Sequence, residues 1–236
     1  MTFDIETEVL AFAQELQDLL DGVLPRPDSV PAEERRIRAE AMVDQARYRL
    51  QVAAPGGLIT LTKDGDPVAS LRVSIQCTRD TDRTYLAVHR SDFELRGWAD
   101  KTPIARLDFL RDAHTVPACH WNIHAERGAA SRLLTLGNPS HSGAFSELHF
   151  PVGGARMRPC LEDVLAFVLH EFGVDRCAGS DPLLHAGRER WRRRQIATLV
   201  RDAPGEAVRV LRDLGYGVTD PVTGPAATKT GKLNAW

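Results

Sequence analysis

The sequence predicts an α+β fold, in which a twisted antiparallel sheet of about five or six strands is covered on one face by helices. Residues 57 to 152 alternate apolar and polar side chains between turn residues, which is typical of antiparallel strands with one buried side. The flanking segments instead repeat their apolar residues at helical spacing, and this predicts helical N- and C-terminal segments. The 236 residues are enough for one buried core.

The N-terminal segment is expected to be helical over residues 1–54. Its first helix spans about 4–21, where apolar residues recur every three or four positions until Gly22, Pro25 and Pro27 end the pattern. A second helix is expected over 32–53, between Pro31 and the sequence "APGG". Both helices are expected to pack on the sheet.

The sheet is expected over 57–152, and each of its strands has two unlike faces. The segments at 68–77, 83–90, 104–110 and 146–152 all place apolar side chains on one side and polar ones on the other. The fifth segment is "PACHWNIHAERG", residues 117–128. Read as a strand, it places on one face His120, Asn122, His124 and Glu126, and on the other Cys119, Trp121, Ile123 and Ala125.

The C-terminal segment, 156–217, is expected to contain three helices. The first covers 159–172, with Pro159 in its first turn and Gly173 as its cap. The others cover about 181–201 and 203–214. Residues 1–217 then form one α+β domain, and 218–236, which lack periodicity, form a flexible tail.

Charge and cysteine content narrow the function classes. The formal charge of -2 gives no polycationic character that would attract nucleic acid or lipid to the chain as a whole. The four cysteines form no C-x-x-C pair, so no zinc knuckle or redox motif is indicated. The acidic N-terminus and the lack of an apolar run of roughly 18 residues predict a cytoplasmic protein with no membrane partner.

The run "RERWRRRQ", Arg188 to Gln195, allows two interpretations. A basic helix that carries a tryptophan can lie along nucleic-acid phosphates. Alternatively, the arginines form a solvated helix face and Trp191 is anchored in the core. The sequence leaves this choice, and the oligomeric state, open.

The polar strand faces collect histidine, arginine and aspartate, and we expect a catalytic cluster there. Imidazole is suited to acid–base catalysis because its ordinary pKa is near 6.5. Two histidines on one strand can stand on opposite sides of a phosphodiester, while an arginine stabilises the developing charge. The expected catalytic residues are Asp108, Arg106, His120, His124 and His149.

Substrate-binding residues are expected in two places. Asn122 and Arg72 share the polar face with the histidines. The stretch "FPVGGARMRP" resembles an anion pocket made of backbone amides and guanidinium groups at the start of a helix. It adds Gly153, Gly154, Arg156 and Arg158. A plain strand-to-helix turn is the alternative, because paired glycines are common turn material.

The motif "HWNIH" invites a metal interpretation that the spacing does not favour. On a helix, H-x-x-x-H is a zinc signal, but Trp121 stands where a zincin has its catalytic glutamate. On a strand, four residues span about 13 Å, too far for one ion. No cofactor is therefore predicted. A divalent metal held across strands, by His149 with His120 or His124 and Asp108, is the alternative.

Two function hypotheses follow, and whether the chain is an enzyme stays open. The first is a toxin-like hydrolase or nuclease that acts on RNA or a nucleotide phosphodiester, with His120 and His124 as acid and base and Arg106 as charge stabiliser. The second is a non-catalytic binding or regulatory module, whose polar face docks a cognate partner protein or a small anion. A concave pocket would favour the first, and a flat surface the second.

One stretch also supports a resemblance. The segments "CHWNIHAERG" and "SELHFPVGGARMRPCLEDVLAFVLHEFGVD" together resemble an uncharacterised family of actinobacterial proteins. The order of "RLDFLRDAH", a histidine-rich strand and "LHF" is similar to small bacterial families found in toxin–antitoxin or mobile-element settings. The resemblance covers about 104–175 and implies that Asp108, His120, His124 and His149 act as one group, although it transfers no reaction. We expect His149 within about 8 Å of His120 or His124, under a lid formed by loop 127–143.

Overall fold

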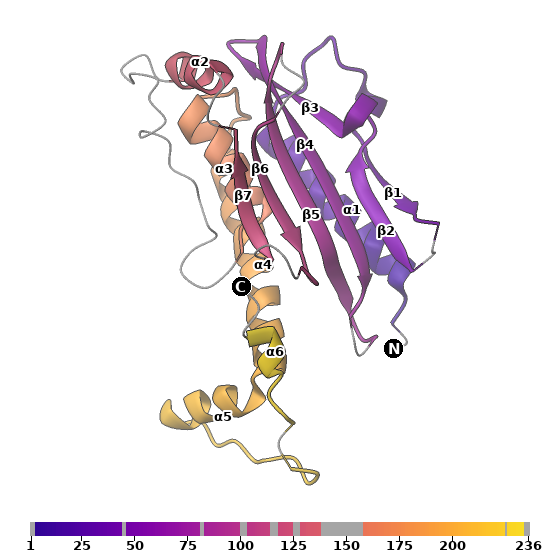
Figure 1. Cartoon of the computed structure of the whole chain (residues 1–236), viewed down its shortest axis with the longest axis vertical. Helices are drawn as coiled ribbons and strands as arrows, with labels where there is room; N and C mark the ends of the chain where they lie inside the picture. The colour runs from indigo at the N-terminus through magenta and orange to yellow at the C-terminus, as the bar shows by residue number, and fades with distance from the viewer. Residues whose placement is uncertain are drawn as a thin grey trace. The chain divides into compact units, whose positions relative to one another are not determined.

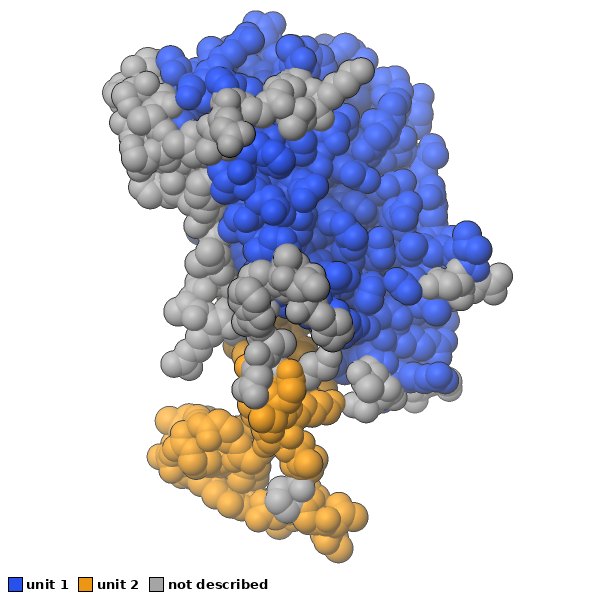
Figure 2. All heavy atoms as spheres, in the orientation of Figure 1, with its two compact units in different colours: residues 1–187 blue, residues 188–236 orange. Residues whose placement is uncertain are grey.

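The computed structural model describes residues 3–43, 46–80, 83–99, 103–113, 118–124, 128–137, 158–224 and 226–233. The chain divides into two compact units, residues 1–187 and residues 188–236, which Figure 2 draws in blue and orange. The first unit contains the sheet and the helices that cover it. No helix in the described ranges is both long and apolar enough to cross a membrane.

The first unit is built on a seven-stranded antiparallel sheet, as the predicted α+β fold requires (Figure 1). Six strands follow the order β1-β2-β4-β5-β6-β7, and β3 pairs with the first half of β4. The strands are β1 (Ile37–Ala41), β2 (Arg47–Val52), β3 (Leu58–Lys63), β4 (Asp66–Arg79), β5 (Leu86–Gly97), β6 (Pro103–Leu110) and β7 (Cys119–Ile123). The predicted strands at 68–77, 104–110 and 117–125 are confirmed over the described residues, whereas 146–152 lies outside them.

The helix expected over 32–53 is wrong. Only Ala32–Arg35 is helical, as a single 3-10 turn, and the rest of the segment forms the hairpin of β1 and β2. In β2 the sequence "RYRLQV" buries Leu50 and Val52 two residues apart, which is the period of a strand rather than of a helix. The sheet therefore begins at Ile37, and the N-terminal segment is helical only in its first half.

Helices cover one face of this sheet. In Figure 1, α1 (Ile5–Val23) and α3 (Leu161–Phe172) both pass behind the strands. Both helices were predicted, and the expected cap Gly173 takes the left-handed conformation, with φ of 57°. The N-cap of α1 is Asp4, whose carboxylate accepts a hydrogen bond from the backbone N–H of Thr7 at 3.3 Å.

The expected loop at 127–143 is wrong for its first part, which is the helix α2 (Gly128–Gly137). Its buried residues Ala130, Leu133 and Leu134 follow helical spacing. Gly137 lies so close to α3 that an added Cβ would stand 2.4 Å from the backbone carbon of Phe172. This approach requires glycine, and it fixes α2 against α3.

The register of β4 separates the two faces of the sheet. Its alternate residues Ala69, Leu71, Val73, Ile75 and Cys77 are at most 3% exposed and lie on the helix-covered face, as predicted. Phe93 and Leu107 continue this layer on the neighbouring strands, and Trp121 of β7 lies 5.8 Å from the ring of Phe167 in α3. Burial raises the pKa of the Cys77 thiol to about 12. The residues between these positions face the other way.

Arg35 ties the end of α1 to the start of the β1–β2 hairpin. Its side chain is buried, and its Nη2 donates hydrogen bonds to the backbone oxygens of Leu20 at 2.9 Å and Leu24 at 3.1 Å. These carbonyls belong to the last turn of α1 and to its C-cap Leu24, so the guanidinium caps the end of the helix.

We expect Arg35→Met to lower the free energy of unfolding by about 1.5–3 kcal/mol, the usual cost of losing hydrogen bonds to a charged group. Methionine keeps much of the apolar stem of arginine, so the loss of stability measures the contribution of the guanidinium group. Urea denaturation measures it. The control is Arg36→Met at the exposed neighbouring position, and equal losses for both variants would contradict the capping role.

Asp175 joins the β3–β4 turn to the segment after α3. Its carboxylate accepts hydrogen bonds from the Thr62 hydroxyl at 2.7 Å and from the backbone N–H groups of Asp64 and Gly65 at 2.8 and 2.9 Å. Asp64 and Gly65 both have positive φ, a conformation that aspartate and glycine adopt more readily than most residues. Partial burial acts to raise the pKa of Asp175, but these hydrogen bonds outweigh it and hold the pKa below its ordinary value.

The stabilisation by Asp175 should therefore depend on pH. A carboxyl with a lowered folded-state pKa stabilises the protein above its unfolded pKa of about 3.9, and loses that contribution as pH falls through the folded value. We expect Asp175→Asn to be less stable than the wild type at pH 7, with the difference shrinking toward pH 3. Thermal unfolding across this range measures it. Asp66→Asn removes an exposed carboxylate of the same hairpin, and a pH-independent loss for Asp175→Asn would contradict the assignment.

The second unit, described by itself, contains the C-terminal part of α4 (Ser180–Asp202), with α5 (Pro204–Asp213) and α6 (Thr230–Leu233). The predicted helices at 181–201 and 203–214 are confirmed. In α5, Arg209 forms ion pairs with Glu206 and Asp213, both at 2.6 Å. The predicted tail contains α6, and the described residues between 216 and 229 lack regular structure.

Candidate functional site on the polar face of the sheet

The face of the sheet away from the helices, here called the polar face, carries two adjacent rows of chemically active side chains. Cross-strand pairing aligns one row through Ser74, Asp92, Asp108 and His120. The next row runs through Arg72, Glu94, Arg106 and Asn122. Directly opposed residues on antiparallel strands lie about 5 Å apart, so neighbours within a row can interact. Five of these residues were predicted from sequence as parts of one site.

Asp108 is the centre of the candidate site. Asn122 Nδ2 donates a hydrogen bond to Asp108 Oδ2 at 2.7 Å. Arg106 Nη2 lies 3.2 Å and His120 Nε2 lies 4.0 Å from the same oxygen. The structure thus brings together four predicted residues, Arg106, Asp108, His120 and Asn122, from the edge strand β7 and its neighbour β6.

The environment of Asp108 opposes its charge. Burial raises the pKa of Asp108, and the nearby carboxylate of Asp92 raises it further. The charges of Arg106 and His120 act in the opposite direction, but the net shift is upward. A partly buried carboxyl with a raised pKa, beside a histidine and an arginine, is typical of functional sites.

The second row surrounds a buried acid with arginines. Glu94, which is 6% exposed, stands between Arg72 and Arg106 in the register and forms an ion pair with Arg96. The Nε atoms of Arg72 and Arg106 are buried and have no hydrogen-bond partner among the described residues. These two guanidinium groups therefore retain donors that protein groups do not use.

His124 lies apart from Asp108, beyond the end of β7. Its backbone N–H donates to Ile104 O at 2.9 Å, and its Nε2 is buried with no hydrogen-bond partner in the described part of the chain. Four residues along a strand separate it from His120, a span of about 13 Å. Asn122, with Arg106 opposite it, lies between the two histidines.

Arg158 lies on the other side of the sheet. Its guanidinium stands 3.8 Å from the centre of the Phe109 ring, and Phe109 alternates with Asp108 along β6. Burial lowers the pKa of Arg158 to about 10. The structure therefore does not bring Arg158 into the Asp108 cluster. The other predicted residues, His149, Gly153, Gly154 and Arg156, lie outside the described residues, so the expected proximity of His149 to His120 or His124 stays a prediction.

Metal binding has no ready ligand set in the described ranges, which contain no group of three or more histidine, cysteine, aspartate or glutamate residues placed to hold an ion. Asp108 and His120 supply only two such groups, and Arg106 competes for the same carboxylate oxygen.

Sequence reasoning missed Asp92, Glu94 and Arg96. The predicted strand stopped at Arg90, whereas β5 continues to Gly97. The signal was present, because "DFELR" alternates these three residues with Phe93 and Leu95. At a β-bulge, Cys77 of β4 pairs with Val88 of β5 while the next residue back, Gln76, pairs with Arg90. The alternation of faces along β5 changes at this bulge, so a face assigned from the first half of β5 does not extend to its second half.

Comparisons with known proteins return no match: no family model, curated protein or solved structure corresponds to this chain. The class that the coordinates define is an α+β protein with an antiparallel sheet, one face covered by helices and the other carrying the Asp108 cluster.

We expect Asp108→Asn to leave the protein at pH 7 as stable as the wild type or more stable. An aspartate with a raised folded-state pKa costs stability above that pKa, and this cost disappears as pH falls below the unfolded value of about 3.9. Asparagine removes the charge and keeps an acceptor for Asn122. Denaturation at pH 7 and pH 3 measures the difference, and any stability advantage of Asp108→Asn over the wild type should shrink toward low pH.

Asp92→Asn is the matched control, because Asp92 lies opposite Asp108 but accepts from Arg90 Nε at 2.8 and 2.9 Å. Losing this partly exposed pair should cost about 0.2–1 kcal/mol. A marked loss of stability for Asp108→Asn at pH 7 would show that Asp108 is a structural carboxylate.

Proposed function

We propose that the chain hydrolyses a phosphodiester bond of RNA or a nucleotide at the polar face. The observation that carries this proposal is the convergence of Asn122, Arg106 and His120 on one oxygen of Asp108. A carboxylate beside an imidazole orients the ring and stabilises its protonated form, and this arrangement makes histidine an effective general base. Neighbouring arginines supply the positive charge that a phosphate requires.

Each residue then has a definite task. A phosphate rests on Arg106 and Arg72, whose Nε groups lack protein acceptors among the described residues. His120 takes the proton from the attacking hydroxyl as its oxygen bonds to phosphorus. His124, on the other side of the Arg106–Asn122 pair, gives a proton to the leaving oxygen as the P–O bond breaks. Asn122 fixes the position of Asp108.

A toxin-like nuclease is the kind of hydrolase that the resemblance over 104–175 favours. Such an enzyme acts in the cytoplasm, and free thiols such as the four cysteines of this chain are usual in that compartment. It is commonly held inactive by a cognate protein, and the polar face is the surface that such a partner would cover. His149 and Arg156 remain proposed members of the site.

A second candidate function is a non-catalytic module that binds an anion or a partner protein on the same face. The observation in its favour is the position of the cluster on β6 and β7, at one edge of an extended sheet. Arginines with unused donors bind an anion whether or not a reaction follows. Turnover of a substrate separates the two functions.

The proposal predicts that the purified chain cleaves single-stranded RNA and that His120→Ala lowers the rate by about 10²–10⁴-fold, the usual contribution of a general base. Asp108→Asn should lose activity to a similar extent while remaining folded. Gel analysis of a labelled oligoribonucleotide measures cleavage. His170→Ala, which removes an exposed histidine of α3, is the control. Binding of RNA without cleavage would support the second function, and His120→Ala with full activity would exclude His120 as the base.

A further inference from the structure

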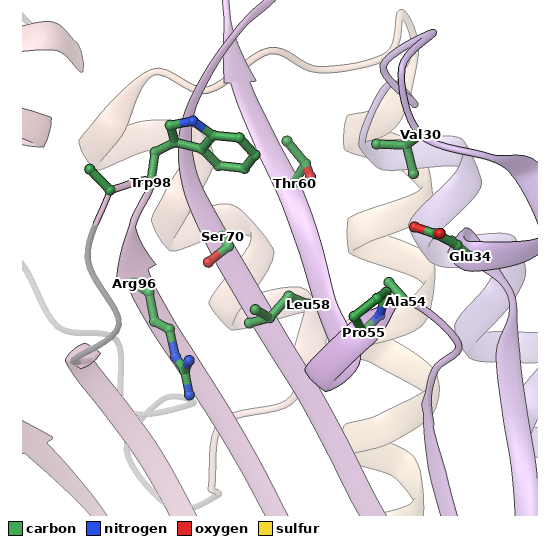
Figure 3. Close-up of a pocket in the computed structure, with 10 residues that line it drawn as sticks. Val30, Glu34, Ala54, Pro55, Leu58, Thr60, Ser70, Arg96 and Trp98 are labelled. Atoms are coloured by element: carbon green, nitrogen blue, oxygen red, sulfur yellow. The ribbon is translucent and has the colours of Figure 1, made fainter.

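A pocket on the polar face lies beyond the two rows that form the proposed site. Its volume is about 390 Å³, within the range of small-molecule sites. Its floor is a third row of the same face, Thr60, Ser70 and Arg96, which pair across β3, β4 and β5. Trp98 and Glu34 stand at its sides, and Figure 3 shows the indole on one side of Thr60 and the carboxylate on the other.

The indole of Trp98 gives the pocket an aromatic wall. Trp98 is 54% exposed, an unusual state for the largest apolar side chain. Leu58, Pro55 and Val30 add aliphatic lining. A flat ring that stacks on the indole would cover this exposed surface, and stacking on aromatic side chains is how proteins hold nucleobases.

The charges of the pocket select against an anion inside it. Among the described residues that line the pocket, Arg96 is the only cation, and its guanidinium is already paired with Glu94. Glu34 adds a carboxylate whose oxygens are directed toward the pocket in Figure 3. This carboxylate forms no hydrogen bond or ion pair with another residue that the structure describes. A neutral ligand that offers N–H donors to Glu34 therefore suits the described lining of the pocket.

We propose that this pocket binds a guanine ring, stacked on Trp98 and hydrogen-bonded through its two adjacent N–H groups to the carboxylate of Glu34. A carboxylate has two acceptor oxygens side by side, which match the paired donors on one edge of guanine. Adenine has no such pair of donors on one edge. The hydroxyl groups of Thr60 and Ser70 are able to donate to guanine's acceptor atoms.

Arg72 lies between the pocket and the proposed catalytic site in the register. Leu58, which lines the pocket, pairs directly with Arg72, and Arg72 begins the row that continues through Glu94 to Arg106. The row of the pocket crosses β4 at Ser70, and the row that contains His120 crosses it at Ser74. These two positions are four residues apart, about 13 Å along the strand. A nucleotide with its base in the pocket extends its phosphate toward Arg72. This placement of the phosphate rests on the proposed function, whereas the guanine site does not.

The test is calorimetric titration of the full chain with guanosine, adenosine and guanosine 5′-monophosphate. We expect guanosine to bind saturably below about 1 mM and adenosine to bind at least tenfold more weakly. Trp98→Ala and Glu34→Gln should each weaken guanosine binding at least tenfold. Trp98→Phe, which keeps an aromatic ring, and Glu33→Gln, which removes an exposed neighbouring charge, should bind within threefold of the wild type.

The outcomes separate this proposal from the proposed function. His120→Ala should bind guanosine normally even where it cleaves no RNA, and an inactive chain that still binds guanosine leaves the pocket assignment intact. Arg72→Gln should weaken the binding of the monophosphate but not of guanosine. The guanine site is overturned if guanosine does not bind, if adenosine binds equally well, or if Trp98→Ala and Glu34→Gln, folded by circular dichroism, bind like the wild type.

Discussion

The pairing of β4 with β5 is the constraint on which the rest of the structure depends. These are the two longest strands, 14 and 12 residues, and every other strand of the sheet joins them directly or through a neighbour. Because side chains alternate along a strand, their register decides which residues enter the core and which reach the polar face. A shift of one residue would turn Arg72 and Glu94 into the apolar core and Val73 and Phe93 onto the polar face. That shift would move the buried apolar residues of β4 out of the core, at a large cost in free energy.

On most of the polar face, oppositely charged side chains lie next to one another. Arg72, Glu94 and Arg106 alternate in sign across three strands, and Arg90 and Asp92 do so along one strand. Asp108 departs from this pattern because it lies directly opposite Asp92, so two carboxylates meet across β5 and β6. The position is electrostatically unfavourable, and Arg106, His120 and Asn122 only partly relieve it. Strain of this kind is more readily explained by function than by stability.

The sequence predicted what depends on short periodic patterns and missed what depends on tertiary context. The face assignments of β4, β6 and β7 were confirmed because Leu71, Leu107 and Trp121 each sit in an unbroken alternation. The segment 32–53 was misassigned because its charged and alanine-rich first half suits a helix, and only pairing with β4 settles β2 as a strand. Within the site, Asp108 and His120 were found from strand alternation alone. Glu94 was missed because it follows the β-bulge in β5. The pocket of Trp98 was missed because one of its lining residues, Glu34, is positioned by the 3-10 turn Ala32–Arg35.

The burial of Cys77 has a consequence for the chemistry of the folded chain. Thiols react with oxidants and alkylating agents through the thiolate, and a pKa of about 12 leaves almost no thiolate at neutral pH. Burial raises the pKa of Cys119 and Cys160 as well. The Cys77 side chain lies on the helix-covered face and is fully buried, so reagents reach it only when the core on that face opens. The rate at which Cys77 is labelled therefore measures how often this core opens.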